Sequence, residues 1–519
     1  MGTFFNPGNG SFTQDKNSEI YIDKTELLKF LNKKLGTNGK CIAVSHARRF
    51  GKSHAAGMID AYYSLGSDSA KLFKGTKIAS DPDYEKYRNK YNVIHLDISS
   101  VWDYHKEDLI ESIEERVCED FQKIYGDLLN YRRDFYLLIQ DIYSLTGIPF
   151  VIIIDEWDCV IRNSHDQALV HKYLQFLHSL FKSEESKSFL ALGYITGILP
   201  IKKIKDESAL NNFQEYTMLD SYPITEYYGF TEKEVKDLCK DYSMDFETVK
   251  AWYNGYLIDG EHMYNPNSVS QALERHKIDS YWRNTSAFDT INTFITMNYA
   301  GLKDDVMKML TGGKVRINTN TFQNDFSIIT SKDDALTALI HLGYLGYDAD
   351  RKKSFIPNYE VATAFELALQ TGSWKEIAES ISKCDELLDE TIDGNAERVA
   401  ELIELAPETY TSILKYNDEN VLSCVLTMAY FTAPAYYNVI REMPSGKGFA
   451  DFVFLPRANA GNRPAMIIEL KYNQSAETAL KQIKEKRYQG ALSGYQGKIL
   501  LVGINYDSEK HHTCMIEEL

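Results

Sequence analysis

Short apolar runs alternate with longer amphipathic stretches from residue 41 to about residue 220. Five runs are almost continuously apolar, which predicts strands buried on both faces. They lie at 41–45, 93–98, 150–155, 189–196 and 216–220. Stretches with helical spacing lie between them, at 52–65, 106–125 and 167–182. This alternation is typical of a parallel sheet covered by helices. It predicts one α/β domain over residues 1–224.

Residues 225–417 read as a helical lid or middle region. In "FTEKEVKDLCKDY", Thr231 precedes a helical pattern and Glu234 follows three residues later, which predicts a capping box. The stretch "DDALTALIHLGYLGYDADRKKSFIPN" begins at residue 333. It predicts a helix, a turn and a short hairpin, as in a winged-helix-like unit.

The pattern changes again in the last hundred or so residues. A helix at 418–431 is followed by strands near 435–441, 449–455 and 465–472, a helix at 475–490 and a closing strand at 498–505. The predicted order is αβββαβ. We expect a third unit over residues 418–519.

Composition limits the classes of protein that fit this pattern. The 519 residues are 44% hydrophobic and 25% charged, which is typical of globular chains and fits about three packed units. The net charge of −17 argues against nonspecific coating of nucleic acid, because that binding needs clustered Lys and Arg. Only a local basic patch stays open.

Cysteine usage and hydropathy bear on the compartment. The seven cysteines are scattered, without C-x-x-C spacing, which favours a reducing compartment and no structural zinc. The first 20 residues lack a basic stretch followed by an apolar run, and no segment supplies the ~20 apolar residues of a membrane span. We expect a cytoplasmic protein without a membrane partner.

The first candidate site is "ARRFGKSHAA" at 47–56. Gly51, Lys52 and Ser53 follow a predicted strand and open a predicted helix, which is the context of a Walker A phosphate loop. His46 stands where the full pattern has its first glycine, and glycine alone adopts positive φ cheaply. On these residues alone, chance and a nucleotide site are equally supported.

A second motif shifts that balance. "FVIIIDEWD" at 150–158 ends an apolar strand in Asp155 and Glu156. In a Walker B motif the first carboxylate serves Mg²⁺ and the second orients the water that attacks the γ-phosphate. A helix cap is the alternative for the same pair. The two motifs together favour nucleotide binding.

With "YIDKTELLKFL" at 21 and "ITGILPIKKIKDESALNNF" at 195, these motifs resemble the AAA-ATPase-like proteins of bacteria, whose loop commonly reads R-P-R-R-F-G-K-S. The resemblance covers about residues 18–290. It implies that a loop without the first glycine is normal, and that ATP and Mg²⁺ bind. Asn211 and Asn212 belong to a recurring motif to which we assign no role.

The resemblance also implies residue roles. Lys52 would hold the β/γ-phosphate, Ser53 and Asp155 would serve Mg²⁺, Glu156 would orient water, and Thr196 would contact the γ-phosphate or that water. A strand-end hydroxyl that satisfies backbone is the alternative for Thr196. At least one of Arg48 and Arg49, with Arg49 our candidate, would face phosphate because guanidinium forks suit it. A solvated loop is the other interpretation.

The second candidate site lies between residues 446 and 489. Glu469 and Lys471 are two apart on one predicted strand, so they share a face, and Asp451 lies on the strand before. Two carboxylates can hold Mg²⁺ or Mn²⁺, and a lysine can assist a water that attacks a phosphodiester. A solvated strand edge is the alternative. The preceding apolar "AMII" favours the site.

This arrangement resembles the PD-(D/E)XK nuclease superfamily over about residues 418–506, whose core has the order αβββαβ. The resemblance implies that Glu419 supports the metal site and that Gln482 and Tyr488 lie near the metal or the nucleic-acid backbone. A polar helix face and a core tyrosine are the alternatives. His46, His54 and His165 lack the spacing of metal ligands and are expected to be structural or surface residues.

Two hypotheses of different classes follow. The first is an ATP-controlled, metal-dependent nuclease acting on nucleic acid, DNA rather than RNA. The second is a nucleotide-gated switch or scaffold that binds nucleic acid or protein through a non-cleaving nuclease-like domain, which the acidic composition mildly favours. A homo-oligomer stays open, because neighbouring copies complete many P-loop ATPase sites with an arginine.

Overall fold

The computed structural model describes residues 2–126, 135–164, 166–201, 210–282, 291–294, 296–297, 299–310, 312–322, 329–371, 375–410, 430, 433, 436–445, 448–456, 461–486, 492, 495, 497–507 and 511–519. The chain divides into two compact units. The first comprises Met1–Leu238, Asn254–Arg275 and Arg316–Ser354, and the second comprises Cys239–Tyr253, His276–Val315 and Phe355–Leu519. The domain boundaries given above stay a prediction.

The first unit is built on a parallel sheet of five strands in the order β2-β3-β4-β1-β5. The strands are β1 (Cys41–Ser45), β2 (Asn92–Asp97), β3 (Phe150–Asp155), β4 (Leu190–Gly197) and β5 (Gln214–Thr217). Four predicted strands match to within one residue, and the fifth, predicted at 216–220, lies earlier as β5 and shares only residues 216 and 217 with the prediction. Because β4 lies between β1 and β3, the carboxyl ends of these three strands meet at one edge of the sheet.

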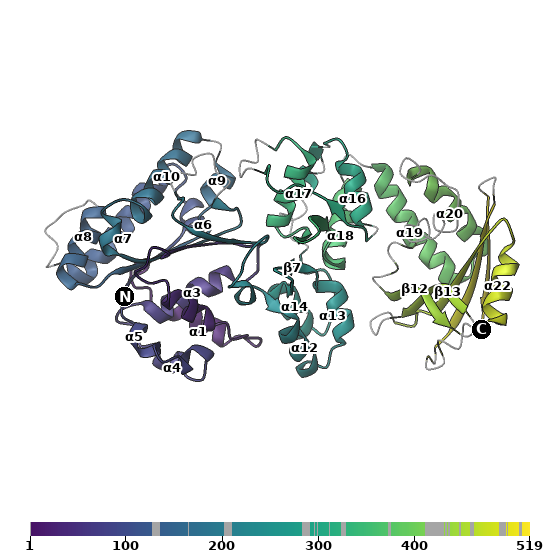
Figure 1. The fold of residues 1–519 in the computed structure, drawn as a ribbon, viewed down its shortest axis with the longest axis horizontal. Coiled ribbons are helices and arrows are strands. Elements are labelled where there is room, and N and C mark those ends of the chain that lie inside the picture. Colours follow the sequence, from purple (N-terminus) through teal and green to yellow (C-terminus); the bar gives the residue numbers. More distant parts are fainter. Residues whose placement is uncertain are drawn as a thin grey trace. The chain divides into compact units, whose positions relative to one another are not determined.

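Helices cover both faces of this sheet (Figure 1). On one face lie α1 (Gly10–Lys16), α2 (Glu26–Asn32) and α3 (Lys52–Tyr63), which pack against Val44, Ile153 and their neighbours. On the other lie α7 (Leu109–Tyr125), α8 (Phe135–Thr146) and α10 (Gln167–Phe181). Burial on both faces explains why β1, β3 and β4 are almost continuously apolar. The predicted α/β class is confirmed.

Two small three-stranded sheets follow the parallel sheet along the chain. One has the order β6-β8-β7, formed by Phe230–Thr231, Glu261–Tyr264 and Tyr256–Ile258. The other has the order β10-β11-β9, formed by Gly346–Asp348, Lys353–Phe355 and Val315–Arg316. The hairpin β10–β11 follows α17 (Lys332–His341), which agrees with the helix, turn and hairpin predicted from residue 333.

The predicted capping box is present at α12 (Glu232–Asp241). The Thr231 amide donates to Glu234 Oε2 at 2.8 Å, and the Glu234 amide donates to Thr231 Oγ1 at 3.3 Å. Glu234 also forms an ion pair with Lys24 at 2.7 Å. Lys24 belongs to the "YIDKTELLKFL" motif, so this part of the motif attaches the N-terminal segment to α12.

In the second unit, helices precede a mixed sheet with the order β12-β13-β14-β15-β16. These strands are Tyr437–Ser445, Gly448–Pro456, Ala465–Tyr472, Ile499–Tyr506 and His512–Glu518. Helices α19 (Lys375–Asp393) and α20 (Ala396–Tyr410) cover one face, and α22 (Ala476–Glu485) covers the other (Figure 1).

The sequence of elements β12, β13, β14, α22, β15 matches the predicted βββαβ part of the core. The prediction that the strand at 498–505 closes the chain is wrong, because β16 follows it and pairs with β15 antiparallel. The predicted helix at 418–431 lies outside the described residues, except for Tyr430. In the described part of the chain, no helix combines the length and the apolar character that crossing a bilayer requires.

Candidate nucleotide and nuclease sites

The loop between β1 and α3 has the backbone of a phosphate loop without the first glycine. Gly51 has φ 85° and Arg49 has φ 66°, whereas His46 is not among the residues with positive φ. Of the two positions with positive φ, 49 and 51, only position 51 is a glycine, the residue that adopts this conformation at low cost. A side chain at position 46 therefore meets no backbone restriction.

His46 anchors the start of this loop. Its ring is fully buried, its Nε2 lies 2.8 Å from Ser221 Oγ, and its centroid lies 5.2 Å from the ring of Tyr228. Burial, with the nearby charge of Lys52, lowers the pKa of His46 to about 3, so the ring is neutral. This agrees with the structural role expected for His46. His54 forms a surface pair with Asp15, and His165 lies outside the described residues.

Lys52 lies inside the loop rather than in solvent. Its amine donates to the carbonyl oxygens of His46 at 2.9 Å and Ala47 at 3.0 Å. Burial lowers the pKa of Lys52, and the carboxylates of Glu156 and Asp155 oppose that effect. The amine is thus held within the group of loop atoms that surrounds a phosphate in P-loop proteins.

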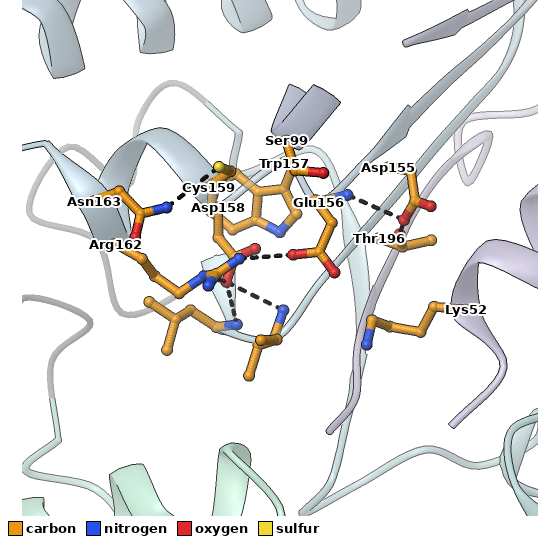
Figure 2. A network of polar contacts seen from close by, with 12 residues as sticks. Lys52, Ser99, Asp155, Glu156, Trp157, Asp158, Cys159, Arg162, Asn163 and Thr196 are labelled. Carbon is orange, nitrogen blue, oxygen red and sulfur yellow. Dashed lines mark hydrogen bonds and ion pairs between the residues drawn. The ribbon is translucent and has the colours of Figure 1, made fainter. Parts of the chain in front are cut away.

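The ends of β3 and β4 are joined directly (Figure 2). The Thr196 hydroxyl donates to Asp155 Oδ1, the Glu156 amide donates to the same oxygen at 3.0 Å, and the Trp157 amide donates to the Thr196 carbonyl at 2.9 Å. Thr196 therefore contacts the carboxylate that we assigned to Mg²⁺. The strand order, which the sequence did not give, brings these residues together.

A polar cleft of about 690 Å³ lies beside these strand ends. Ser53, Asp155 and Glu156 line it together with Arg48, whereas Arg49 is not among its lining residues. Sequence reasoning missed the other lining residues: Asp97, Ser99, Trp102, Asp103, Lys106, Cys159, Arg162 and Asn163. Asp97 pairs in register with Asp155, so its place follows from the pairing of β2 with β3.

Glu156 and Asp158 are bridged by one arginine (Figure 2). Arg162 Nη2 lies 2.6 Å from Glu156 Oε2, and Arg162 Nε lies 2.9 Å from Asp158 Oδ2. Burial raises the pKa of Glu156, and the nearby negative charge of Asp158 raises it further. The positive charges of Lys52 and Arg162 oppose this increase. In the sequence, the only sign of this bridge is that Asp158 and Arg162 are four residues apart. This spacing is common for ion pairs on helices, so it does not single out a functional residue.

The C-terminal residues meet on the sheet face that α22 covers. The register of β13 and β14 pairs Phe452 with Ile468, so Asp451 lies opposite Glu469. Lys471 Nζ donates to Glu469 Oε1 at 3.1 Å, and the Gln482 side-chain amide donates to the same oxygen. Asp451 Oδ2 accepts the Leu470 amide at 2.8 Å. The structure thus places Asp451, Glu469, Lys471 and Gln482 together.

Glu469 has the features of a cation ligand. Its side chain is 2% exposed, and in the described part of the chain its buried Oε2 has no hydrogen-bond partner. Burial, reinforced by Asp451, raises the pKa of Glu469 to about 7. A buried carboxylate oxygen without a partner is costly unless a cation or a donor reaches it. Mg²⁺ or Mn²⁺ fits two oxygen donors of this kind.

Among the described residues, no group of three or more His, Cys, Asp and Glu side chains could hold a metal. A cation at Asp451 and Glu469 would leave coordination positions that water and a substrate phosphate can fill, as they commonly do around Mg²⁺. Glu419 and Tyr488, the other two accessory residues, lie outside the described residues.

Gly503 permits this assembly. It pairs in register with Glu469, and a Cβ at its position would lie 2.4 Å from the Ala476 carbonyl oxygen. Only glycine allows α22 to approach the sheet this closely. Because α22 lies close to β14 and β15, Gln482 reaches the Glu469 carboxylate.

Comparisons with known proteins agree with both resemblances. Residues 10–205 match the family model described as predicted AAA-ATPase, and residues 417–516 match the model of the PD-(D/E)XK nuclease superfamily. These matches confirm the two domain types predicted from the motifs. The curated uncharacterized protein in the vnfD 5′ region of Azotobacter chroococcum mcd 1 is 24% identical over 274 residues. That match spans 51% of this chain and 50% of the relative, about half its length.

Three solved structures are also similar. The Aeropyrum pernix ORC2 protein in its ADPNP–ADP complexes has 8% identity and a TM-score of 0.33, covering 71% of this chain and 98% of that one. AMPPCP-bound DnaA from Aquifex aeolicus has 12% identity and a TM-score of 0.27, with 66% and 92% covered. The Aeropyrum pernix ORC1 protein in complex with DNA has 12% identity and a TM-score of 0.27, with 70% and 97% covered.

Proposed function

We propose that this chain is an ATPase whose C-terminal domain cleaves phosphodiester bonds in nucleic acid with the help of a divalent cation. The observation that carries the nuclease proposal is Glu469 Oε2, which is buried and has no hydrogen-bond partner among the described residues, on a residue opposite Asp451 and beside Lys471. A solvated strand edge, the alternative interpretation, would not bury these side chains: Glu469 and Lys471 are 2% and 9% exposed.

The ATPase part rests on the meeting of three strand ends. Lys52 and the loop amides would bind the phosphates of ATP, and Ser53 and Asp155 would hold Mg²⁺. Glu156 lines the same cleft as Ser53 and Asp155, where it would orient the attacking water. Thr196, which contacts Asp155, would report on the γ-phosphate.

The nuclease part uses two carboxylates and one lysine. When bound at Asp451 and Glu469, Mg²⁺ or Mn²⁺ would supply Lewis-acid stabilisation of charge on the phosphate. Lys471 Nζ lies 3.1 Å from Glu469 Oε1 and would position a water or stabilise the developing charge. Gln482 orients Glu469 from α22. We propose DNA as the preferred substrate and nucleotide turnover as its control.

The first test measures cleavage directly. The purified chain is incubated with single- and double-stranded DNA and RNA, with Mg²⁺ or Mn²⁺, in the presence and absence of ATP. Glu469→Ala should abolish cleavage and leave ATP binding intact. Glu477→Ala is the matched control, because Glu477 is exposed on the same helix as Gln482 and should not change cleavage.

The ATPase is tested separately with Lys52→Ala, which should abolish ATP binding. If the wild type binds and hydrolyses ATP but never cleaves any of these substrates with either cation, the nuclease proposal fails and the nucleotide-gated switch takes its place. If cleavage persists in Glu469→Ala, the site assignment fails.

A further inference from the structure

Arg162 holds the carboxylate that would orient the attacking water. One Glu156 oxygen, Oε2, lies 2.6 Å from Arg162 Nη2. In the part of the chain that the structure describes, no residue donates a hydrogen bond to the other oxygen, Oε1. Glu156 lines the cleft together with Ser53 and Asp155. One oxygen is thus fixed by the protein, and the other is left for the cleft.

Arg162 is itself held in place by Asp158 (Figure 2). Its Nε lies 2.9 Å from Asp158 Oδ2, and Asp158 is fully buried. The same oxygen accepts the backbone amides of Ile198 at 3.1 Å and Leu199 at 2.9 Å, directly after β4. A carboxylate with two backbone donors cannot turn freely, so it fixes the plane of the guanidinium. The Arg162 side chain is only 11% exposed, which further restricts it.

The backbone of Glu156 agrees with this restraint. Glu156 has φ 52°, a left-handed conformation that glutamate rarely adopts. The Cys159 amide donates to the Glu156 carbonyl at 2.9 Å, and the Trp157 amide donates to the Thr196 carbonyl. Strained backbone of this kind persists where several contacts fix it, and it gathers at active sites. Here the Glu156 side chain that this backbone carries contacts Arg162.

We propose that Arg162 is a positioning residue for ATP hydrolysis: it fixes Glu156 through Oε2 so that Oε1 meets the attacking water, and Asp158 fixes Arg162 in turn. The inference rests on the proposed ATPase function. It adds a chain of contacts from the backbone after the Thr196 strand, through Asp158 and Arg162, to Glu156. A base oriented by a third group is a recurring arrangement in catalysis.

Steady-state ATP hydrolysis by the full chain tests this. In Arg162→Gln, we expect kcat to fall roughly 10- to 100-fold, as misplacement of a reacting group by about 1 Å does, while KM and the Kd of a nonhydrolysable ATP analogue change less than about twofold. Arg162→Lys should give an intermediate kcat, because one ammonium cannot bridge two carboxylates as the guanidinium fork does.

Two further variants complete the experiment. Asp158→Asn keeps an acceptor for the Ile198 and Leu199 amides but weakens the hold on Arg162, so kcat should also fall. Asp158→Asn replaces Arg162→Gln as the test if Arg162→Gln does not fold. Loss of binding of the nonhydrolysable ATP analogue would reveal such misfolding. Arg88→Gln is the control: Arg88 forms an ion pair with Glu85 at 2.7 Å in the same domain, and its removal should leave kcat unchanged.

The outcomes separate the alternatives. A fall in kcat with unchanged nucleotide affinity, graded from Lys to Gln, supports the inference. An unchanged kcat overturns the inference. A rise in kcat also overturns it, because Arg162 would then restrain Glu156. A rise in KM alone overturns it as well, because Arg162 would then be a nucleotide contact. A wild type that binds no ATP overturns the proposed function itself, and this inference with it.

Discussion

Gly503→Ala should damage the nuclease domain although it adds only a single methyl group. The new Cβ would lie 2.4 Å from the Ala476 carbonyl oxygen and 3.1 Å from Ala479 Cβ and Leu480 Cγ. Ordinary contact begins at 3.4 Å, so the first turn of α22 must retreat by about 1 Å. Overpacking of this kind costs about 1–3 kcal/mol, or roughly 5- to 150-fold in the local opening equilibrium.

The same retreat moves Gln482 away from Glu469, so cleavage should fall along with stability. Hydrogen exchange of the full chain measures the first effect: backbone amides within 476–485 and 499–506 should exchange faster in Gly503→Ala. Gly10→Ala is the matched control, since a Cβ at Gly10 meets nothing within 4 Å. Exchange rates in α22 and β15 that equal those of the wild type would refute the argument that glycine at 503 sets the helix-to-sheet distance.

Three other predictions follow from single contacts. Asp60 Oδ2 lies 2.5 Å from His95 Nδ1. Burial lowers the pKa of His95, but the charge and the hydrogen bond of Asp60 have the larger effect and raise this pKa to about 9. Because this lies above the unfolded value, up to about 3 kcal/mol of stability is present below about pH 6.5 and is lost as pH rises through 9; calorimetry should show Tm falling over that range in the wild type and a flatter profile in His95→Gln. Thr231→Ala removes half of the capping box and should cost about 1 kcal/mol, measured by urea unfolding, with Thr231→Ser close to wild type. Asp451→Asn keeps an acceptor for the Leu470 amide but removes a charge from the cation site; cleavage should fall roughly 100-fold or more, and a variant that cleaves at the wild-type rate would exclude Asp451 as a ligand.

Strands β1 to β4 were predictable because they are largely buried and therefore appear as apolar runs, whereas the edge strand β5, "QEYT", buries only Tyr216. The last strand, β16, was not predictable. Its residues "HTCMIEE" are mostly half-buried, as expected for an edge strand that pairs on one side only, and such a strand gives a weak hydrophobic signal. The order of the strands was also beyond the sequence, since apolar runs carry no information on which neighbour each strand pairs with.

The candidate sites divide in the same way. Gly51, Lys52, Asp155, Glu156 and Glu469 belong to local motifs, and the sequence proposed them once those motifs were combined with the predicted strands and helices around them. Arg162 could not be proposed in this way, because an Asp–Arg pair four residues apart is ordinary on any helix surface, and its value arises only from its contact with Glu156. Gly503 carries no motif at all, and its role depends on the carbonyl of Ala476 on another element.

The loop proposed to bind nucleotide shows how tertiary contacts can take the place of a missing motif residue. Where a glycine would leave the entry of the loop free, the buried ring of His46 fixes it against Ser221 and Tyr228. The Gly229 amide donates to the Phe50 carbonyl at 3.0 Å, and the Asn265 side chain donates to the Arg48 carbonyl at 3.3 Å. The loop's shape therefore depends on the segment that follows the sheet, rather than on local glycine geometry alone. Because these contacts hold both the entry and the exit of the loop, a change in that segment would reach the proposed phosphate site directly.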